Sequence, residues 1–484
     1  MGFSLKLCPL VFLLSFFLAF SFSLSFSSSS ATQLCSHEHA TVLLQFISAF
    51  SINKSASSEC EYFSGVKSYS KTLSWKEGTD CCFWNGITCD NVTGNVIDLD
   101  LSCSNLYGSF PSNSSLFLTK SLQRLNLSFN DFKLSKIPRE IGQFVSLKHL
   151  DLSYSEFSGQ VPNEISHLSN MLEVLDIGNN NIKDTFPYWL ESLPKLQVLI
   201  LRSNKFQGFV RDTKANSSFS KLRVLDLSNN DFFGPLPVHF IENLKAMVNP
   251  LEDDNSAQYM GGSFSYEYSI VVILKGLSIE LEKVLTVFTS FDLSKNKFAR
   301  EIPKVIGKLS SLKGLNLSYN NFSGQIPHSL QNLTNLEWLD LSSNELVGEI
   351  PQELVSLTSL SVLNLSNNQL VGCIPQGNQF NTFGNSSYEG NLRLYGFPLT
   401  KSCDGNGLPQ QPPSSFHGKD HELWEFGWRV VLLGYGCGFV FGLLIGYLTF
   451  HNGEPKWFVT LFNGQQNQRA RNVRKARTRA QRRN

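Results

Sequence analysis

The sequence predicts an α/β solenoid, a right-handed superhelix of about ten coils of 24 residues that is capped by disulfides and followed by one transmembrane helix. Three observations predict it. The pattern L-x-L-S-x-N-x-[LF]-x-G-x-[IV]-P recurs ten times, eight cysteines gather at the two ends of the repeated region, and an apolar run of 21 residues lies near the C-terminus. Together they divide the chain into a secreted, repeat-built part and a short part beyond a membrane.

The N-terminal end is typical of a secreted protein. Residues 1–30 are predicted to be a signal peptide, because one lysine precedes a long apolar run that ends in serine-rich sequence. A retained anchor is the alternative, since this run is longer than most signal cores. Sequons for N-glycosylation fit the secretory route and are found at Asn53, Asn91, Asn113, Asn126, Asn216, Asn316, Asn321, Asn332, Asn364 and Asn385.

The cysteines predict disulfides rather than a metal site. Cys8 lies in the signal segment and Cys437 in the apolar run, which leaves an even number between them. Those eight are Cys35, Cys60, Cys81, Cys82, Cys89, Cys103, Cys373 and Cys403. Apart from one adjacent pair they lack the short paired spacings of a metal site, and clustering at two ends suits bridges that seal a domain in an oxidising compartment.

The repeats occupy the middle of the chain. Their first leucine, or its equivalent, stands at 99, 125, 150, 175, 199, 225, 291, 315, 339 and 363. A period near 24 indicates a leucine-rich repeat, in which stacked coils share one apolar spine and each x-L-x-L segment forms a short parallel strand. The Asn in the following turn is predicted to bond to the backbone of adjacent coils, and the Phe after it to fill the core.

The outward strand positions are the predicted binding surface, because a solenoid presents this sheet to partners. An Asp recurs between the two leucines, and its recurrence favours a backbone-supporting role over ligand contact. The neighbouring positions that vary are the better ligand candidates: Arg124, Phe129, His149, Tyr154, Arg202, Lys295, Tyr319 and Trp338.

One step between repeats is 66 residues long, so residues 248–287 form an insert without repeat sequence. Long loops are usually functional or disordered. Two readings have equal weight: an ordered excursion that contacts a partner, with Tyr266 and Tyr268 as candidates, or a structural insert that packs on the coils.

Several segments resemble one plant family. "FSGQIP" is similar to plant repeat coils and "LSWKEGTDCCFWNGITCD" to the plant extracellular cap, while "LKGLSIELEKVLTVFTSFDLSKNKF" and "LLGYGCGFVFGLLIGY" resemble receptor-like proteins of the Cf type, the class of tomato resistance receptors. The resemblance implies disulfides Cys35–Cys81 and Cys82–Cys89. Cys60 with Cys103 and Cys373 with Cys403 are then expected, although their pairing stays open. Family members usually carry many more repeats, so we expect a shortened array with central repeats missing near residues 169–171.

The apolar run from Val430 to Phe450 would span about 31 Å as a helix, enough for a bilayer core. Nine Lys and Arg against one Glu follow it, which predicts a cytoplasmic tail and a single-pass type I protein of the plasma membrane with its N-terminal domain outside. Four glycines share one helix face at Gly434, Gly438, Gly442 and Gly446. The resemblance implies that this face binds a single-span receptor-like kinase adapter.

The predicted organisation is a signal peptide (1–30), an N-terminal cap (31–95), repeats (96–247), the insert (248–287), further repeats (288–384), a C-terminal cap and spacer (385–428), a transmembrane helix (429–450) and a basic tail (451–484). No enzymatic motif, cofactor, catalytic residue or nucleic-acid partner is expected. The resemblance implies a receptor without a kinase domain that recognises an extracellular peptide or protein, expected to be pathogen-derived, in plant defence. The alternatives are a developmental receptor subunit or decoy, and a module similar to polygalacturonase inhibitors.

Overall fold

The computed structural model describes residues 35–212, 219–249, 270–274, 277–281, 288–399 and 403. The chain divides into two compact units, Met1–Gly405 and Asn406–Asn484, and the described residues all belong to the first. The signal segment, Asn216, Tyr266, Tyr268 and the apolar run with its glycines lie outside these ranges. Among the described residues, no helix combines the length and apolarity needed to cross a membrane.

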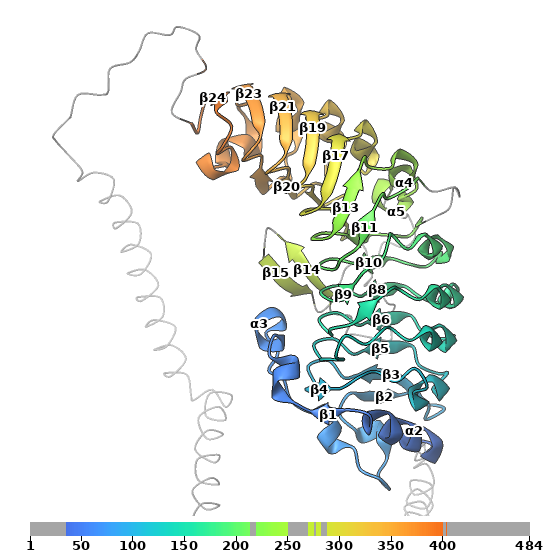
Figure 1. The fold of residues 1–484 in the computed structure, drawn as a ribbon. Helices are drawn as coiled ribbons and strands as arrows, with labels where there is room; N and C mark the ends of the chain where they lie inside the picture. Colours follow the sequence, from blue (N-terminus) through green and yellow to red (C-terminus); the bar gives the residue numbers. More distant parts are fainter. Residues whose placement is uncertain are drawn as a thin grey trace, which may run out of the picture. The chain divides into compact units, whose positions relative to one another are not determined.

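A parallel sheet runs through every coil of the solenoid (Figure 1). Its eleven strands lie in the order β2, β3, β5, β6, β8, β10, β12, β16, β18, β20 and β22. All are parallel neighbours except β2, which pairs with β3 in the antiparallel sense. Their bounds are Ile87–Cys89, Val96–Asp100, Arg124–Asn126, His149–Asp151, Val174–Asp176, Val198–Ile200, Val224–Asp226, Ser290–Asp292, Gly314–Asn316, Trp338–Asp340 and Val362–Asn364.

The register of this sheet confirms the ten predicted coils. Leu99 pairs with Leu125, Leu125 with Leu150, and so on to Leu363, with Phe291 in the place of a leucine. Each of these side chains points into the spine and is at most 3% exposed. The 66-residue step therefore interrupts the sequence of the repeats but not the sheet, because β12 pairs directly with β16.

A second parallel sheet, which we did not predict, follows the turns after β10, β12, β16, β18, β20 and β22 of the first sheet and ends at β24. Its order is β11, β13, β17, β19, β21, β23 and β24. The bounds are Gln207–Gly208, Asp231–Gly234, Lys297–Glu301, Asn321–Gln325, Glu345–Glu349, Gln369–Cys373 and Arg393–Tyr395, and a separate pair joins β7 (Ser158–Gly159) to β9 (Asn181–Ile182). Gly324 adopts a φ of 76°, a left-handed value that glycine accepts without strain, which explains the glycine of the SGxIP segment.

The third side of most coils is built from 3-10 helices, so the helical part of the predicted α/β class needs correction. These helices are η4 (Ser115–Leu118), η5 (Arg139–Gln143), η6 (Asn163–Leu168), η7 (Tyr188–Ser192), η8 (Lys304–Lys308), η9 (His328–Asn332), η10 (Gln352–Ser356), η11 (Asn378–Thr382) and η12 (Asn385–Ser387). A coil near 24 residues leaves only about five residues for this side. Five residues suit the tighter helix, whose runs are normally short.

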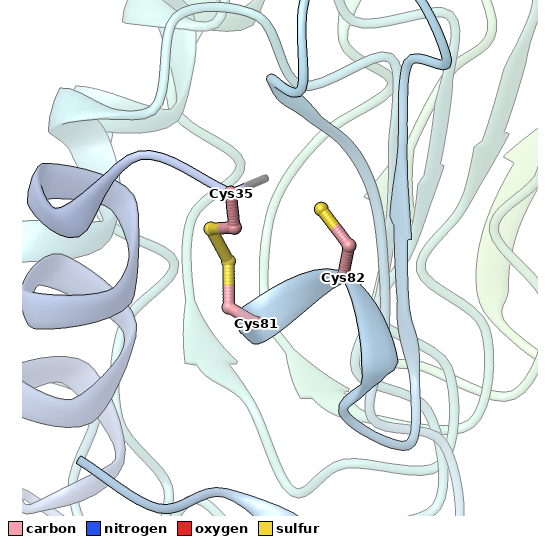
Figure 2. A group of neighbouring side chains, drawn as sticks. All are labelled: Cys35, Cys81 and Cys82. Carbon is pink, nitrogen blue, oxygen red and sulfur yellow. A yellow bond between two sulfur atoms is a disulfide. The ribbon is translucent and has the colours of Figure 1, made fainter. Parts of the chain in front are cut away.

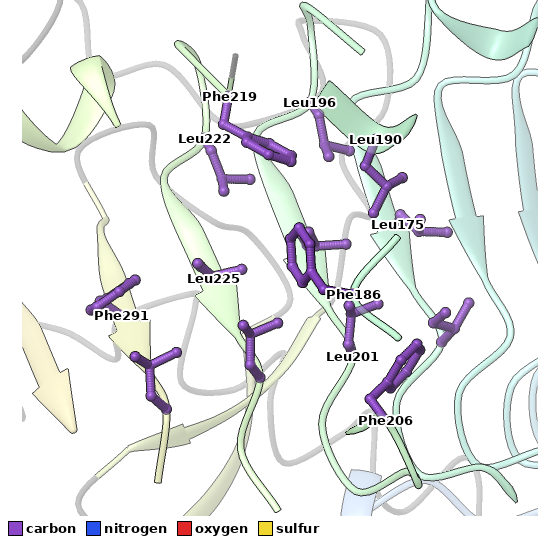
Figure 3. Close-up of a cluster of buried hydrophobic side chains, with 14 of the residues drawn as sticks. Leu175, Phe186, Leu190, Leu196, Leu201, Phe206, Phe219, Leu222, Leu225 and Phe291 are labelled. Atoms are coloured by element: carbon purple, nitrogen blue, oxygen red, sulfur yellow. The ribbon is translucent and has the colours of Figure 1, made fainter. Parts of the chain in front are cut away.

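The spine is one continuous apolar core (Figure 3). Phe186, Phe206, Phe219 and Phe291 pack with the leucines of the same coils, and each is at most 1% exposed. The predicted Phe ladder is present, with Phe298 and Phe322 stacked at 6.3 Å between ring centroids. No coil could bury these groups alone, so stacking is what stabilises each coil.

The N-terminal cap closes the first coil. Its elements are α2 (His37–Ile47), β1 (Ser51–Ile52), η1 (Lys54–Ser57), α3 (Cys60–Ser64), η2 (Lys71–Ser74) and η3 (Cys81–Phe83), with β1 paired to β4 (Leu106–Tyr107). Ser36 caps α2 by accepting a hydrogen bond from the His39 amide. Phe46 on α2 contacts Phe110 at 5.7 Å between ring centroids, so the helix covers the open end of the spine.

The insert interrupts one coil just before its strand. The coil carries α4 (Val238–Glu242) and α5 (Lys245–Val248), and Met247 of α5 fills a fully buried core position. The chain is described again from Phe288, and the Thr289 carbonyl accepts a hydrogen bond from the Lys313 amide of the next coil. Between them, β14 (Ile270–Leu274) and β15 (Leu277–Leu281) form an antiparallel hairpin. It lies beside α3 on the side of the solenoid opposite the 3-10 helices (Figure 1).

Candidate ligand-binding face

Four disulfides hold the described cysteines in the pairs we expected: Cys35–Cys81, Cys60–Cys103, Cys82–Cys89 and Cys373–Cys403. The sulfurs of Cys35, Cys81 and Cys82 come within 4.8 Å of one another (Figure 2). All three belong to disulfides, so none is a thiolate that could bind a metal ion.

The turn asparagines support the backbone, as predicted. The Asn130 side-chain amide donates to the carbonyls of Leu101 and Leu127 at 2.8 and 2.9 Å, and its oxygen accepts from the Leu106 amide at 2.9 Å. The same pattern recurs at Asn180, Asn204, Asn230, Asn296, Asn320, Asn344 and Asn368. The amide donors and oxygens of these side chains are engaged in hydrogen bonds within the fold, so they are not available to a ligand.

The recurring Asp also supports its own turn. One Asp151 oxygen accepts from the Ser153 amide at 2.9 Å and from the Ser153 hydroxyl at 2.7 Å, and Asp340 does the same with Ser342. In the last coils, asparagine alternates with aspartate at this position. Asn316 donates to Asp292 at 3.0 Å, and Asn364 donates to Asp340 at 3.2 Å.

At the N-terminal end of the sheet, the outer face carries a closed ion network. Arg124 lies 3.2 Å from Asp98 and 3.4 Å from Asp100, and Lys71 lies 2.9 Å from Asp100. Burial opposes the charged form of Asp100, but Lys71 and Arg124 overcome it and hold the pKa of this carboxyl below its usual range. His149, beside this network, is 1% exposed, and burial followed by the Arg124 charge lowers its pKa well below the ordinary value.

The N-terminal cap covers the next part of this face. Cys60, at the start of α3, is tied to Cys103 of the first coil, and Phe129 packs against this disulfide. Phe129 stacks on Tyr154 at 4.4 Å between ring centroids, and Phe63 of α3 contacts Tyr154 at 4.9 Å. These aromatic residues hold the cap in place instead of facing solvent.

In the middle of the sheet, a buried arginine lies among carboxylates. Arg202 is 1% exposed and lies 3.5 Å from Asp226. Burial, followed by the neighbouring Asp151, raises the pKa of Asp176 to about 8, because Arg202 offsets only part of the charge in this row. Outward strand residues such as Asp151, Asp226 and Asp292 are buried here.

The outer face is accessible at its C-terminal end. Asn316, Asp340 and Asn364 are half-exposed, whereas the residues at the same position from Asn126 to Asp292 are buried. Lys295 and Tyr319 are exposed, and Tyr319 retains 57% of its accessible surface. The half-exposed strand positions of coils 8 to 10, together with the exposed turn residues Lys295 and Tyr319 that follow β16 and β18, are called the accessible face of coils 7 to 10.

The ligand candidates therefore need correction. Sequence position placed all of them on the outward side, but five are buried and a sixth is largely covered by the cap. The buried five are Arg124, Phe129, His149, Arg202 and Trp338. Tyr154 is half-buried, Lys295 and Tyr319 are exposed, and Tyr266 and Tyr268 lie outside the described residues.

Two exposed residues were missed. Asn229 and Asn367 occupy the same repeat position as Lys295 and Tyr319, and all four have a left-handed φ between 52° and 54°. Asparagine tolerates this conformation better than most residues, which made both look like ordinary turn residues. The signal that could have found them was their repeat position, not their residue type.

Comparison with known families agrees with this architecture. Models described as "Leucine rich repeat" match residues 121–144, 146–168, 170–232, 288–346 and 327–370, and one described as "Leucine rich repeat N-terminal domain" matches 39–90. A plant ice-binding protein of known structure has 25% sequence identity and a TM-score of 0.55, covering 77% of this chain and all of that one.

Named relatives are longer than this chain. "Receptor-like protein 35" of Arabidopsis thaliana is 48% identical over 378 residues, which make up 78% of this chain and 39% of that protein. "Receptor-like protein 43" of the same plant is 49% identical over 363 residues, 74% of this chain and 49% of that protein. The chain thus spans less than half the length of these two relatives. By its repeats, its N-terminal cap and these relatives, the chain belongs to the family of plant leucine-rich repeat receptor-like proteins.

Proposed function

We propose that this chain is a cell-surface receptor without a kinase domain, which binds an extracellular peptide or protein and signals in plant defence through an associated receptor-like kinase. The observation that carries the binding part is the accessible face of coils 7 to 10, where Lys295 and Tyr319 stand exposed in the turns that follow β16 and β18. Aromatic and cationic side chains on a fixed surface are the residue types that anchor protein partners. The relatives named as receptor-like proteins support the same reading.

The signalling part of the proposal rests on the sequence of the apolar run. Gly434, Gly438, Gly442 and Gly446 would let a second helix approach closely in a membrane. A single-pass type I orientation at the plasma membrane would place the repeats outside and the basic tail inside. The kinase would then join through the membrane helix, and the exposed sequons would carry glycans.

Two experiments test the two parts separately. For the kinase, full-length protein is immunoprecipitated from plant membranes and the co-purified kinases are identified. Gly438→Leu with Gly442→Leu should abolish their recovery, while Val440→Ala, between these positions and on the opposite side of a helix, should leave it intact. Undiminished recovery with the double variant would refute the helix contact.

For the ligand, leaves that express the full-length chain are treated with pathogen culture filtrate, and the oxidative burst is measured. Tyr319→Ala should raise the filtrate concentration needed for a half-maximal burst at least tenfold. An anchoring aromatic side chain often contributes about 2 kcal/mol or more of binding free energy. Asn335→Ala, an exposed change away from the accessible face, should leave that concentration unchanged. An equal response from both variants would contradict binding at Tyr319, and kinase recovery without any burst would indicate the decoy alternative.

A further inference from the structure

The coil that carries the insert is assembled from two separate pieces of chain. In the following coils, a buried leucine stands three residues before the first strand leucine, as Leu312 does before Leu315. In the coil of β16 the corresponding residue by sequence is Phe288, but the fully buried Met247 already stands in the matching position, ten residues after Pro237, as Leu312 stands nine after Pro303. Phe288 is therefore displaced from the spine.

The displaced Phe288 contacts an aromatic residue from two coils away. Its ring stacks with that of Trp338 at 6.1 Å between centroids and 26° between planes, within the range of favourable aromatic pairs. Trp338 is on β20 and only 6% exposed, although it occupies an outward strand position. Val362, which pairs with Trp338 on the next strand, is half-buried.

The intervening coil leaves room for this contact. Gly314 of β18 pairs with Trp338, and a Cβ placed on Gly314 would lie 1.7 Å from the Cζ2 atom of the indole. Real carbon atoms do not approach so closely, so the indole lies directly over the missing side chain of Gly314. The φ of Gly314 is not in the left-handed region. The backbone conformation therefore does not require glycine here, and the close approach of the indole does.

We propose that Trp338 is a positioning residue. Its indole, which lies over Gly314, holds Phe288 on the outer face and so fixes where the chain returns to the solenoid after the insert. This inference does not depend on the proposed receptor function. This point of return matters because the hairpin β14–β15 of the insert lies beside α3 of the N-terminal cap, several coils away from Trp338 along the sheet. Trp338, which sequence reasoning took for a ligand contact, acts here on the chain itself.

The test is hydrogen exchange in the hairpin, measured by mass spectrometry on the full-length chain. Trp338→Ala should speed exchange of the β14 and β15 amides roughly threefold to tenfold, from the usual strength of an aromatic pair. Val362→Ala removes apolar bulk from the same column without touching Phe288, and should leave hairpin exchange unchanged. If the two variants behave alike, the proposal is wrong.

Gly314 supplies a sharper arm. Gly314→Ala should displace the indole and speed hairpin exchange as Trp338→Ala does, yet it should add nothing in a chain that already carries Trp338→Ala. Effects that simply add would overturn the mechanism, because they would show that Gly314 acts by another route. Phe288→Leu, which leaves the solenoid sheet untouched, provides the same readout should the tryptophan variant fail to fold.

Discussion

Removing one turn asparagine should cost far more stability than its size suggests, and Asn344→Ala is the cleanest case. Its amide donates to the carbonyls of Leu317, Leu341 and Ser342 at 3.0, 3.1 and 3.2 Å, and its oxygen accepts from the Phe322 amide at 3.0 Å. The residue is 8% exposed, so water cannot freely replace these partners. At about 1 kcal/mol net per hydrogen bond, we expect a loss of about 3–4 kcal/mol.

The assay is urea unfolding followed by circular dichroism, with hydrogen exchange at Phe322 as the local readout. Asn335→Ala serves as the matched control, because this exposed asparagine makes one hydrogen bond, to the Ser310 carbonyl at 2.9 Å. It should cost less than about 1 kcal/mol. Asn344→Asp should be no better than alanine, since a carboxylate would face three carbonyl oxygens. A loss below 1 kcal/mol for Asn344→Ala would refute the view that these asparagines hold the coils together.

Two further predictions concern the aspartate row and the sequons. Because the folded pKa of Asp176, raised to about 8 by burial and Asp151, exceeds the unfolded value near 4, the fold holds more protons and its stability should fall as pH rises between these values. Asp176→Asn should flatten that slope by at most about 1.4 kcal/mol per pH unit in pH-dependent thermal melts, and an unchanged slope would contradict it. Glycopeptide mass spectrometry should find glycans on the exposed sequons but not on those whose amides lie within the large sheet. The exposed set is Asn53, Asn91, Asn113, Asn321, Asn332 and Asn385, and the sheet set is Asn126, Asn316 and Asn364. Glycans on the sheet set in folded protein would contradict this prediction, because they would show that the side-chain amides within the sheet are accessible to glycosylation.

The sequence was sufficient for one part of what repeats. Strand register, the turn asparagines and the aspartate turns follow from the spacing alone, since each coil must meet the next in the same way. The second sheet recurs from β11 onward but was missed. Its residues alternate less clearly, and its pairing depends on a left-handed glycine such as Gly324 rather than on an apolar pattern.

The accessible face could not be read from spacing, because exposure depends on what lies over the sheet. Phe129 and Tyr154 are outward by position, yet the Cys60–Cys103 disulfide brings α3 against them. Trp338 is also outward by position, but its indole lies over Gly314. The segments that cover the sheet come from distant parts of the chain, and the repeat pattern does not predict them.

Departures from the repeat are the signals that could have been used. At adjacent coils, Gly178 replaces the usual Ser after the strand, Ile200 replaces the Asp within it, and Arg202 replaces the next Ser. A Cβ on Gly178 would lie 3.1 Å from the Arg202 Cγ, so the glycine makes room for the arginine, while the missing carboxylate at Ile200 separates Asp176 from Asp226. The three changes together place one guanidinium between two carboxylates. Coordinated exceptions of this kind, like Gly314 beside Trp338, indicate a side chain that crosses from one coil to another, whereas conformity to the repeat indicates a residue that serves only its own coil and the next.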